Sequence, residues 1–247
     1  MTTDAPLYAS PLFQRIAGGT WRPGGLTLTR HALELCALEP GSEVLDIGCG
    51  QGASLSLLRD LGFKGTGLDK EYSLTEPFPF VQADAQQPPF LDASFDAVLC
   101  ECVLSLLPDA EQALRRFAAV LRQKGRLILT DLYIRQPLSQ TPAAHDGASC
   151  LAGARSRDTL EHLLRKSGFH LLTFEDHTAS LKDLAARLLW YGDEPLLNAL
   201  HGRNDTVTSH ACATSSCRCL GSGGIRYGYG LWIATPSTHA CSCNVSP

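Results

Sequence analysis

Short apolar runs alternate along this chain with longer segments in which leucines recur at helical spacing. The apolar runs predict strands at residues 44–47, 65–69, 80–83, 95–99, 126–133, 169–174 and 225–234. The leucine-rich segments predict helices at residues 26–38, 53–61, 109–122, 156–166 and 179–191. The stretch between the second and third strands is short and holds prolines, so we expect no full crossover helix there.

The alternation of strands and helices predicts an α/β fold. We expect a doubly wound, mostly parallel sheet of seven strands with helices on both faces, whose ligand crevice lies outside the carboxyl ends of the strands. Residues 1–40 would form a helical cap segment, 41–234 the main domain with an irregular insertion at 192–224, and 235–247 a tail. A proline-containing loop at 135–149 is a candidate lid over the substrate.

Composition limits the possible partners and location. The 247 residues are 44% hydrophobic and 19% charged, with a formal net charge of −4. This balance argues against nucleic acid as a partner, because phosphate recognition requires clustered Lys and Arg. We find no signal peptide and no run long enough to cross a bilayer, so we expect no membrane partner, a cytoplasmic location and mostly reduced cysteines. The oligomeric state stays open.

A glycine-rich turn follows the first predicted strand. Residues 46–52 (DIGCGQG) hold three glycines, which permit unusual backbone angles and leave no Cβ between the main chain and a ligand. Their spacing differs from the dinucleotide-binding G-x-G-x-x-G. The carboxylate of Asp46 beside the turn would repel a pyrophosphate and attract sulfonium and ammonium groups. The turn therefore favours a cationic cofactor.

Two further acids follow the next two strands. Asp69 ends the second strand, where a ribose diol could give two hydrogen bonds to its carboxylate. Asp84 follows the third strand and could accept a hydrogen bond from an adenine amino group. Each acid taken alone also fits a solvated strand end.

Three ordered motifs carry a family resemblance. The segments 44–52 (VLDIGCGQG), 67–69 (GLD) and 82–85 (QADA) resemble the class I S-adenosylmethionine-dependent methyltransferase family. The resemblance covers about residues 41–234 and implies S-adenosylmethionine as the cofactor, with the glycines behind its methionyl and ribose parts. The residues that it leads us to expect at the cofactor are Asp46, Gly48, Cys49, Gly50, Gly52, Asp69, Lys70, Asp84, Ala85 and Glu101.

A more particular resemblance begins at residues 100–109 (CECVLSLLPD), which are similar to the arsenite methyltransferase signature. Cys102 occupies the cysteine of that signature, although Glu101 replaces its first Asn. Cys150 begins a segment similar to another of that family's motifs, and the resemblance implies that this thiolate holds trivalent arsenic. A soft metalloid prefers thiolate ligands. We therefore take Cys102 and Cys150 as candidate catalytic residues; ordinary buried thiols are the alternative for Cys100 and Cys102.

Other polar residues have two interpretations each. His177 could act as a general base oriented by Asp176 or Glu175, or the same segment could cap the following helix. Asp131 ends the fifth strand and fits either an acceptor pocket or a structural role.

Five further cysteines lie near the carboxyl end of the chain. Their spacing matches no familiar zinc motif, so we predict no metal site from them. They are Cys212, Cys217, Cys219, Cys241 and Cys243.

The sequence thus favours methyl transfer to a small-molecule acceptor, with a thiol-bound metalloid such as trivalent arsenic as a candidate acceptor. Two alternatives remain. One is a non-catalytic, thiol-rich carrier or sensor of soft metals on the same scaffold. The other is a nicotinamide-dependent dehydrogenase, which the glycine spacing and Asp46 disfavour.

Overall fold

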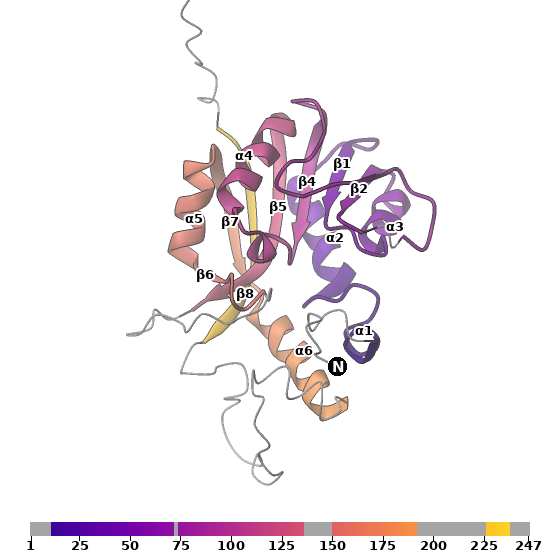
Figure 1. Cartoon of the computed structure of the whole chain (residues 1–247), viewed down its shortest axis with the longest axis vertical. Helices are drawn as coiled ribbons and strands as arrows, with labels where there is room; N and C mark the ends of the chain where they lie inside the picture. The colour runs from indigo at the N-terminus through magenta and orange to yellow at the C-terminus, as the bar shows by residue number, and fades with distance from the viewer. Residues whose placement is uncertain (1–10, 72–73, 136–149, 192–225, 238–247) are drawn as a thin grey trace, which may run out of the picture.

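One sheet organises the computed structural model, which describes residues 11–71, 74–135, 150–191 and 226–237 (Figure 1). Its order is β3-β2-β1-β4-β5-β8-β7, and a short β6 pairs with β5. The first five strands run parallel to one another, whereas β8 is antiparallel to both β5 and β7. The prediction of a doubly wound, mostly parallel α/β sheet is confirmed. The strands are β1 (Glu43–Ile47), β2 (Lys64–Asp69), β3 (Phe80–Gln82), β4 (Phe95–Glu101), β5 (Leu121–Ile134), β6 (Arg155–Ser156), β7 (Phe169–Asp176) and β8 (Tyr227–Pro236).

Helices cover both faces of the sheet (Figure 1). Buried side chains of α4 and α5 pack on one face, and those of α2, α3 and α6 pack on the other. The first helix, α1, packs against α6 through a small separate apolar cluster. The helices are α1 (Pro11–Ala17), α2 (Gly25–Cys36), α3 (Ala53–Asp60), the 3₁₀ helix η2 (Leu104–Leu106), α4 (Ala110–Val120), α5 (Arg157–Lys166) and α6 (Thr178–Tyr191).

The largest boundary difference from the sequence prediction lies between α4 and β5. The helix was expected to reach residue 122, but it ends at Val120 because Leu121 takes an extended conformation and pairs with Phe95. A register shift follows, and regular pairing resumes at Arg126 opposite Ala97. Strand β5 therefore begins at Leu121, whereas the sequence predicted its start at residue 126.

The stretch between β2 and β3 has no helix among its described residues, as the prolines predicted. Two elements escaped the sequence analysis, α1 and the two-residue β6. Neither has a repeated apolar pattern long enough to identify it.

Several predictions concern residues outside the described ranges. They are the lid at 136–149, the insertion at 192–224, and the cysteines at 212, 217, 219, 241 and 243. Within the described ranges, no helix has the length and apolar character needed to span a membrane.

Candidate functional site

The predicted glycine turn joins β1 to α3 at the carboxyl edge of the sheet. All three glycines, Gly48, Gly50 and Gly52, have positive φ angles of 69°, 50° and 84°. The turn is held to the next strand because the Gly48 N–H donates to the Leu68 carbonyl at 2.7 Å. This backbone conformation requires residues without a Cβ.

The glycines differ in what an added Cβ would meet. At Gly48 it would lie 2.4 Å from Cγ2 of Val103, and at Gly52 it would lie 2.9 Å from Leu74. At Gly50 it would meet nothing within 4 Å. Gly50 therefore faces open space, whereas Gly48 makes room for a protein side chain.

Asp69 holds the turn from the end of β2. One carboxylate oxygen accepts the Gly50 N–H at 2.9 Å, and the other accepts the Glu71 N–H at 3.2 Å. The acid predicted to bind a ribose thus lies directly beside the glycine that faces open space. Its carboxylate oxygens keep further lone pairs for a ligand.

Asp84 and its neighbours lie just beyond β3. The Gln86 N–H donates to Asp84 at 2.9 Å, and the Lys70 ammonium lies 3.6 Å from its carboxylate. The hydrogen bond from Gln86 and the charge of Lys70 outweigh the effect of burial and hold the pKa of Asp84 below its usual value. Ala85 is buried in the core.

Cys49 offers only its backbone to a ligand in this turn. Its side chain is buried, and an added Cβ at Gly67 would lie 2.7 Å from its sulfur. The thiol therefore packs against β2.

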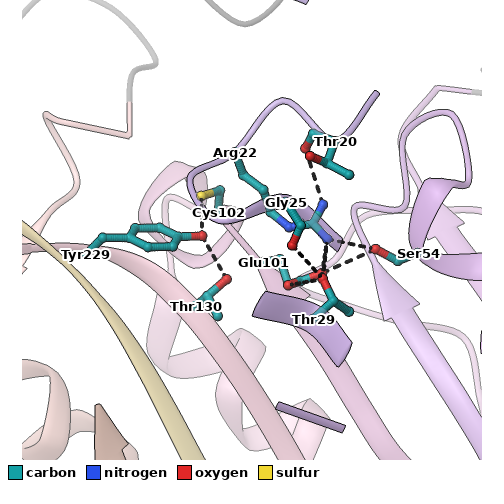
Figure 2. A network of polar contacts seen from close by, with 9 residues as sticks. All are labelled: Thr20, Arg22, Gly25, Thr29, Ser54, Glu101, Cys102, Thr130 and Tyr229. Atoms are coloured by element: carbon teal, nitrogen blue, oxygen red, sulfur yellow. Dashed lines mark hydrogen bonds and ion pairs between the residues drawn. The ribbon is translucent and has the colours of Figure 1, made fainter. Parts of the chain in front are cut away.

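A buried ion pair joins the end of β4 to the segment before α2 (Figure 2). Glu101, the last residue of β4, lies 2.6 Å from the Arg22 guanidinium, and both side chains are less than 10% exposed. Arg22 also donates to Thr29 at 2.6 Å and to Ser54 at 3.0 Å. Both hydroxyls in turn donate to Glu101. The segment before α2 is thereby fixed over the carboxyl edge of the sheet.

Sequence reasoning identified Glu101 but missed Arg22. Arg22 precedes a Pro-Gly-Gly break and carries no motif, so only the fold reveals that it meets β4. Burial has the largest single effect and lowers its pKa, but the charge of Glu101, with smaller contributions from Tyr229, Asp46 and Cys102, brings the net pKa above the ordinary value. Arg22 is fully charged at neutral pH.

Asp46 is the most perturbed acid near the turn. It is 3% exposed, and burial, together with the charge of Glu101, raises its pKa to about 8 even though Arg22 acts in the opposite direction. Its Oδ2 atom and the Nε of Arg22 are both buried without a hydrogen-bond partner among the described residues. Native proteins rarely leave such atoms unpaired, so both atoms call for a partner that the described residues do not supply.

Cys100 and Cys102 have different environments. Cys100 is completely buried in β4, which confirms the alternative of an ordinary core thiol for this residue. Cys102 is half-buried and takes a positive φ of 57°, although it is not a glycine. Its sulfur lies 3.1 Å from the Tyr229 hydroxyl, which donates to Thr130 at 2.9 Å (Figure 2). Such strained conformations cluster at functional sites.

Cys150 lies on the same side of the sheet as Cys102. Both pack against the cluster beneath α2 and α3. Burial raises the pKa of Cys102, and nearby Asp131 and Cys150 raise it further. The loop that follows Cys150 packs against η2, since a Cβ added at Gly153 would lie 1.8 Å from the Ser105 carbonyl oxygen. Cys150 therefore contributes to the raised pKa of Cys102, and both thiols pack against the same cluster.

Asp131 holds η2 against β5. Its carboxylate accepts the Ser105 N–H at 2.8 Å, the Ser105 hydroxyl at 2.7 Å and the Leu132 N–H at 2.7 Å. Burial raises its pKa to about 6 against the effect of these bonds. For Asp131 the sequence left open an acceptor pocket or a structural role, and these contacts match the structural role.

His177 lies between β7 and α6. Its ring nitrogen Nε2 lies 2.9 Å from Glu175, whereas Asp176 accepts the Thr178 N–H at 2.8 Å and so caps the helix. Glu175 rather than Asp176 orients the His177 ring. A surface hollow of about 460 Å³ lies between the starts of α2 and α6, and Arg22 contributes to its lining.

Comparison with known proteins now identifies the family. The family described as "Methyltransferase domain" matches residues 45–129, which include the turn and β4. O-methyltransferase rstn1 of Aspergillus nomiae is 30% identical over 60% of this chain and 73% of its own length. The chain belongs to the class I S-adenosylmethionine-dependent methyltransferase family.

Other relatives in the family carry different names. Methyltransferase GfsG of Streptomyces halstedii is 31% identical over 62% of this chain, and the arsenite methyltransferase of Aquipseudomonas alcaligenes is 29% identical over 60%. This chain covers only 61% and 50% of the length of these two proteins. Their names describe them and not this chain.

Solved structures support the fold. Phosphoethanolamine N-methyltransferase 2 of Haemonchus contortus, in complex with S-adenosyl-L-methionine, superposes with a TM-score of 0.67 at 18% identity, over 92% of this chain and 56% of its own.

Proposed function

We propose that this chain binds S-adenosylmethionine at the β1–α3 turn and transfers its methyl group to a small acceptor. The observation that carries the proposal is that two buried atoms, Asp46 Oδ2 and Arg22 Nε, lack a hydrogen-bond partner among the described residues, while Gly50 in the turn faces open space. The amino-acid end of the cofactor has one ammonium and one carboxylate, which match these two atoms in charge. Asp69 then supports the ribose and Asp84 the adenine.

The cofactor supplies an activated methyl group on a positively charged sulfur. The protein contributes position, charge and exclusion of water. Asp46 neutralises the ammonium when it ionises, and Arg22 is held rigidly by Glu101, Thr29 and Ser54. Because an in-line displacement needs mainly alignment, a dedicated general base is not required.

A direct test is turnover with labelled S-adenosylmethionine across thiol, metalloid and small-metabolite acceptors. Asp69→Ala should weaken cofactor binding by roughly 1.5–3 kcal/mol, because it loses charge-assisted hydrogen bonds. Asp92→Ala is a matched control, since Asp92 is an exposed acid paired only with surface Arg116. Equal affinity of both variants in calorimetry would refute the ribose assignment.

For the acceptor we propose a soft metalloid held by Cys102 and Cys150. The support is their proximity, the strained backbone at Cys102 and the position of both thiols after the carboxyl edge of the sheet. Burial is the main cause that raises the pKa of Cys150 to about 12, so both thiols are protonated at neutral pH before a ligand binds. Ligation must therefore release protons.

The acceptor proposal is tested with Cys102→Ser and Cys150→Ser. Serine nearly keeps the size but is a poor ligand for soft elements, so both variants should lose methylated arsenic product while their cofactor affinity stays unchanged. Cys36→Ser is the control, because Cys36 is buried in α2. Turnover at the wild-type rate by both variants would exclude the metalloid. Arsenite binding without any methyl transfer would instead favour the carrier or sensor alternative.

A further inference from the structure

A second cluster of polar groups lies at the same edge of the sheet, outside the proposed cofactor site. It consists of His31 in α2, Glu175 in β7 and His177 before α6. The Nε2 atoms of the two histidines lie 2.8 and 2.9 Å from the same oxygen, Glu175 Oε2. All three candidate ligand atoms lie within 4.8 Å of one another.

The fold, rather than the local sequence, assembles this cluster. His31 and Glu175 are 144 residues apart, and they meet because α2 packs on β8, whose neighbour in the sheet is β7. Glu175 pairs with Leu231, whose buried side chain belongs to the cluster packed beneath α2. The backbone of His177 is fixed by its N–H, which donates to the Tyr229 carbonyl at 2.8 Å.

We propose that His31, Glu175 and His177 bind a divalent transition-metal ion of the zinc type. Two imidazoles and one carboxylate form a donor set that zinc uses where it keeps a fourth position for another ligand. Isolated acidic groups often lie close together without an ion, but here two imidazoles converge on one carboxylate oxygen. That convergence brings two imidazole nitrogens and one carboxylate oxygen within 4.8 Å of one another.

The geometry permits an ion after small movements. With metal–ligand distances of about 2.0–2.2 Å and tetrahedral angles, the N–O separations would be about 3.3 Å, so they must widen by about 0.5 Å. The three side chains are between 24% and 42% exposed, which leaves them room to rotate.

An ion here would join α2 to the start of α6 across β7 and β8. The hollow between these helices is lined by Thr27, one turn before His31, and by Ser180, one turn after His177. This hollow therefore reaches to within a turn of both histidines. The proposal stands without the methyltransferase activity, because it rests on other residues.

The test is Zn²⁺ binding to the chelator-treated full chain, followed by calorimetry and by NMR of the imidazole nitrogens. We expect a single equivalent of Zn²⁺ to shift the resonances of His31 and His177 and to raise the thermal midpoint. His31→Gln and His177→Gln should each weaken this binding by at least about tenfold, because glutamine is a poor zinc ligand. His170→Gln is the matched control, since His170 is an exposed histidine on the same strand, β7.

The thiols of this chain are the main competing ligands. They are distinguished by Co²⁺ absorption, because a thiolate site gives sulfur-to-metal charge-transfer bands that an imidazole–carboxylate site lacks. Melting each variant in chelator separates a loss of stability from a loss of binding. Binding that survives both histidine substitutions, or that disappears when the thiols are alkylated, would overturn the proposal.

Discussion

Asp46 should release a proton when S-adenosylmethionine binds. In the ligand-free protein, burial and the charge of Glu101 raise the pKa of this carboxyl group to about 8. It is therefore mostly neutral at pH 7. A cationic ammonium at its unpartnered Oδ2 stabilises the ionised form, so the pKa must fall on binding.

The size of the effect follows from the pKa. At pH 7 a group with a pKa of about 8 carries about 0.9 proton, and at pH 9 it carries about 0.1. If the pKa of the bound form lies well below 7, binding at pH 7 releases nearly one proton and binding at pH 9 releases almost none. Affinity should correspondingly rise with pH up to about 8.

The assay is calorimetry at fixed pH in buffers with different ionisation enthalpies, whose slope gives the number of protons exchanged. The cofactor has its own α-amino group with a pKa near 7.7–8.0, so Asp46→Asn is needed to subtract that contribution. S-adenosylhomocysteine, which keeps the ammonium but lacks the sulfonium, should release the same proton. Equal proton exchange by the wild type and Asp46→Asn at pH 7 would refute the argument.

Two more predictions concern the pH dependence of stability and the glycines of the turn. A carboxyl group whose pKa is raised in the folded state stabilises the fold below its unfolded pKa, and this contribution is lost as pH rises through the folded pKa. The free energy of unfolding should therefore fall between about pH 4 and pH 8. Asp46 alone contributes at most about 1.4 kcal/mol per pH unit to this fall. Asp131, with a pKa of about 6, lowers the free energy of unfolding in the same way, but only over the lower part of this pH range. In urea titrations, Asp46→Asn should therefore lose the dependence of unfolding free energy on pH between pH 6 and 8. An unchanged pH dependence would contradict the assignment of the raised pKa to Asp46. Gly48→Val should destabilise the fold by roughly 1–3 kcal/mol because of its positive φ and the contact with Val103. The added Cβ of Gly50→Ala would have no neighbour within 4 Å, so this change should chiefly weaken cofactor binding. Equal losses of unfolding free energy in Gly48→Val and Gly50→Ala would contradict the different roles of the two glycines.

Sequence periodicity predicted most of the fold because the core elements are long and regular. Every expected helix and strand exists, and the glycine turn lies where the motif placed it. The errors occur where long-range pairing overrides local pattern. Leu121 is a good helix former, yet pairing with Phe95 draws it into β5.

The candidate site was predictable only where chemistry follows a motif. Asp46 is the second-last residue of β1 and Asp69 is the last residue of β2, so parallel topology brings them to one edge. Arg22 and His31 lie in the amino-terminal segment, and their partners, Glu101 and Glu175, are far away in sequence. No local pattern specifies such pairs, because they depend on how α2 lies across the sheet.

The buried ion pair and the proton on Asp46 belong to one electrostatic system, and Glu101→Gln tests their coupling. Glu101 raises the pKa of Asp46, whereas Arg22 lowers it. Removing the Glu101 charge takes away the repulsion and leaves the Arg22 charge uncompensated, so both effects lower the pKa of Asp46.

The Glu101→Gln variant should unfold about 3 kcal/mol more easily, because it isolates a buried cation. It should also release fewer protons than the wild type when S-adenosylmethionine binds at pH 7, although Asp46 itself is intact. Both quantities come from the same protein, by urea denaturation and by calorimetry in paired buffers. A variant that loses stability but keeps the full proton release would show that burial alone sets the pKa of Asp46, and that the ion pair only holds Arg22 in place.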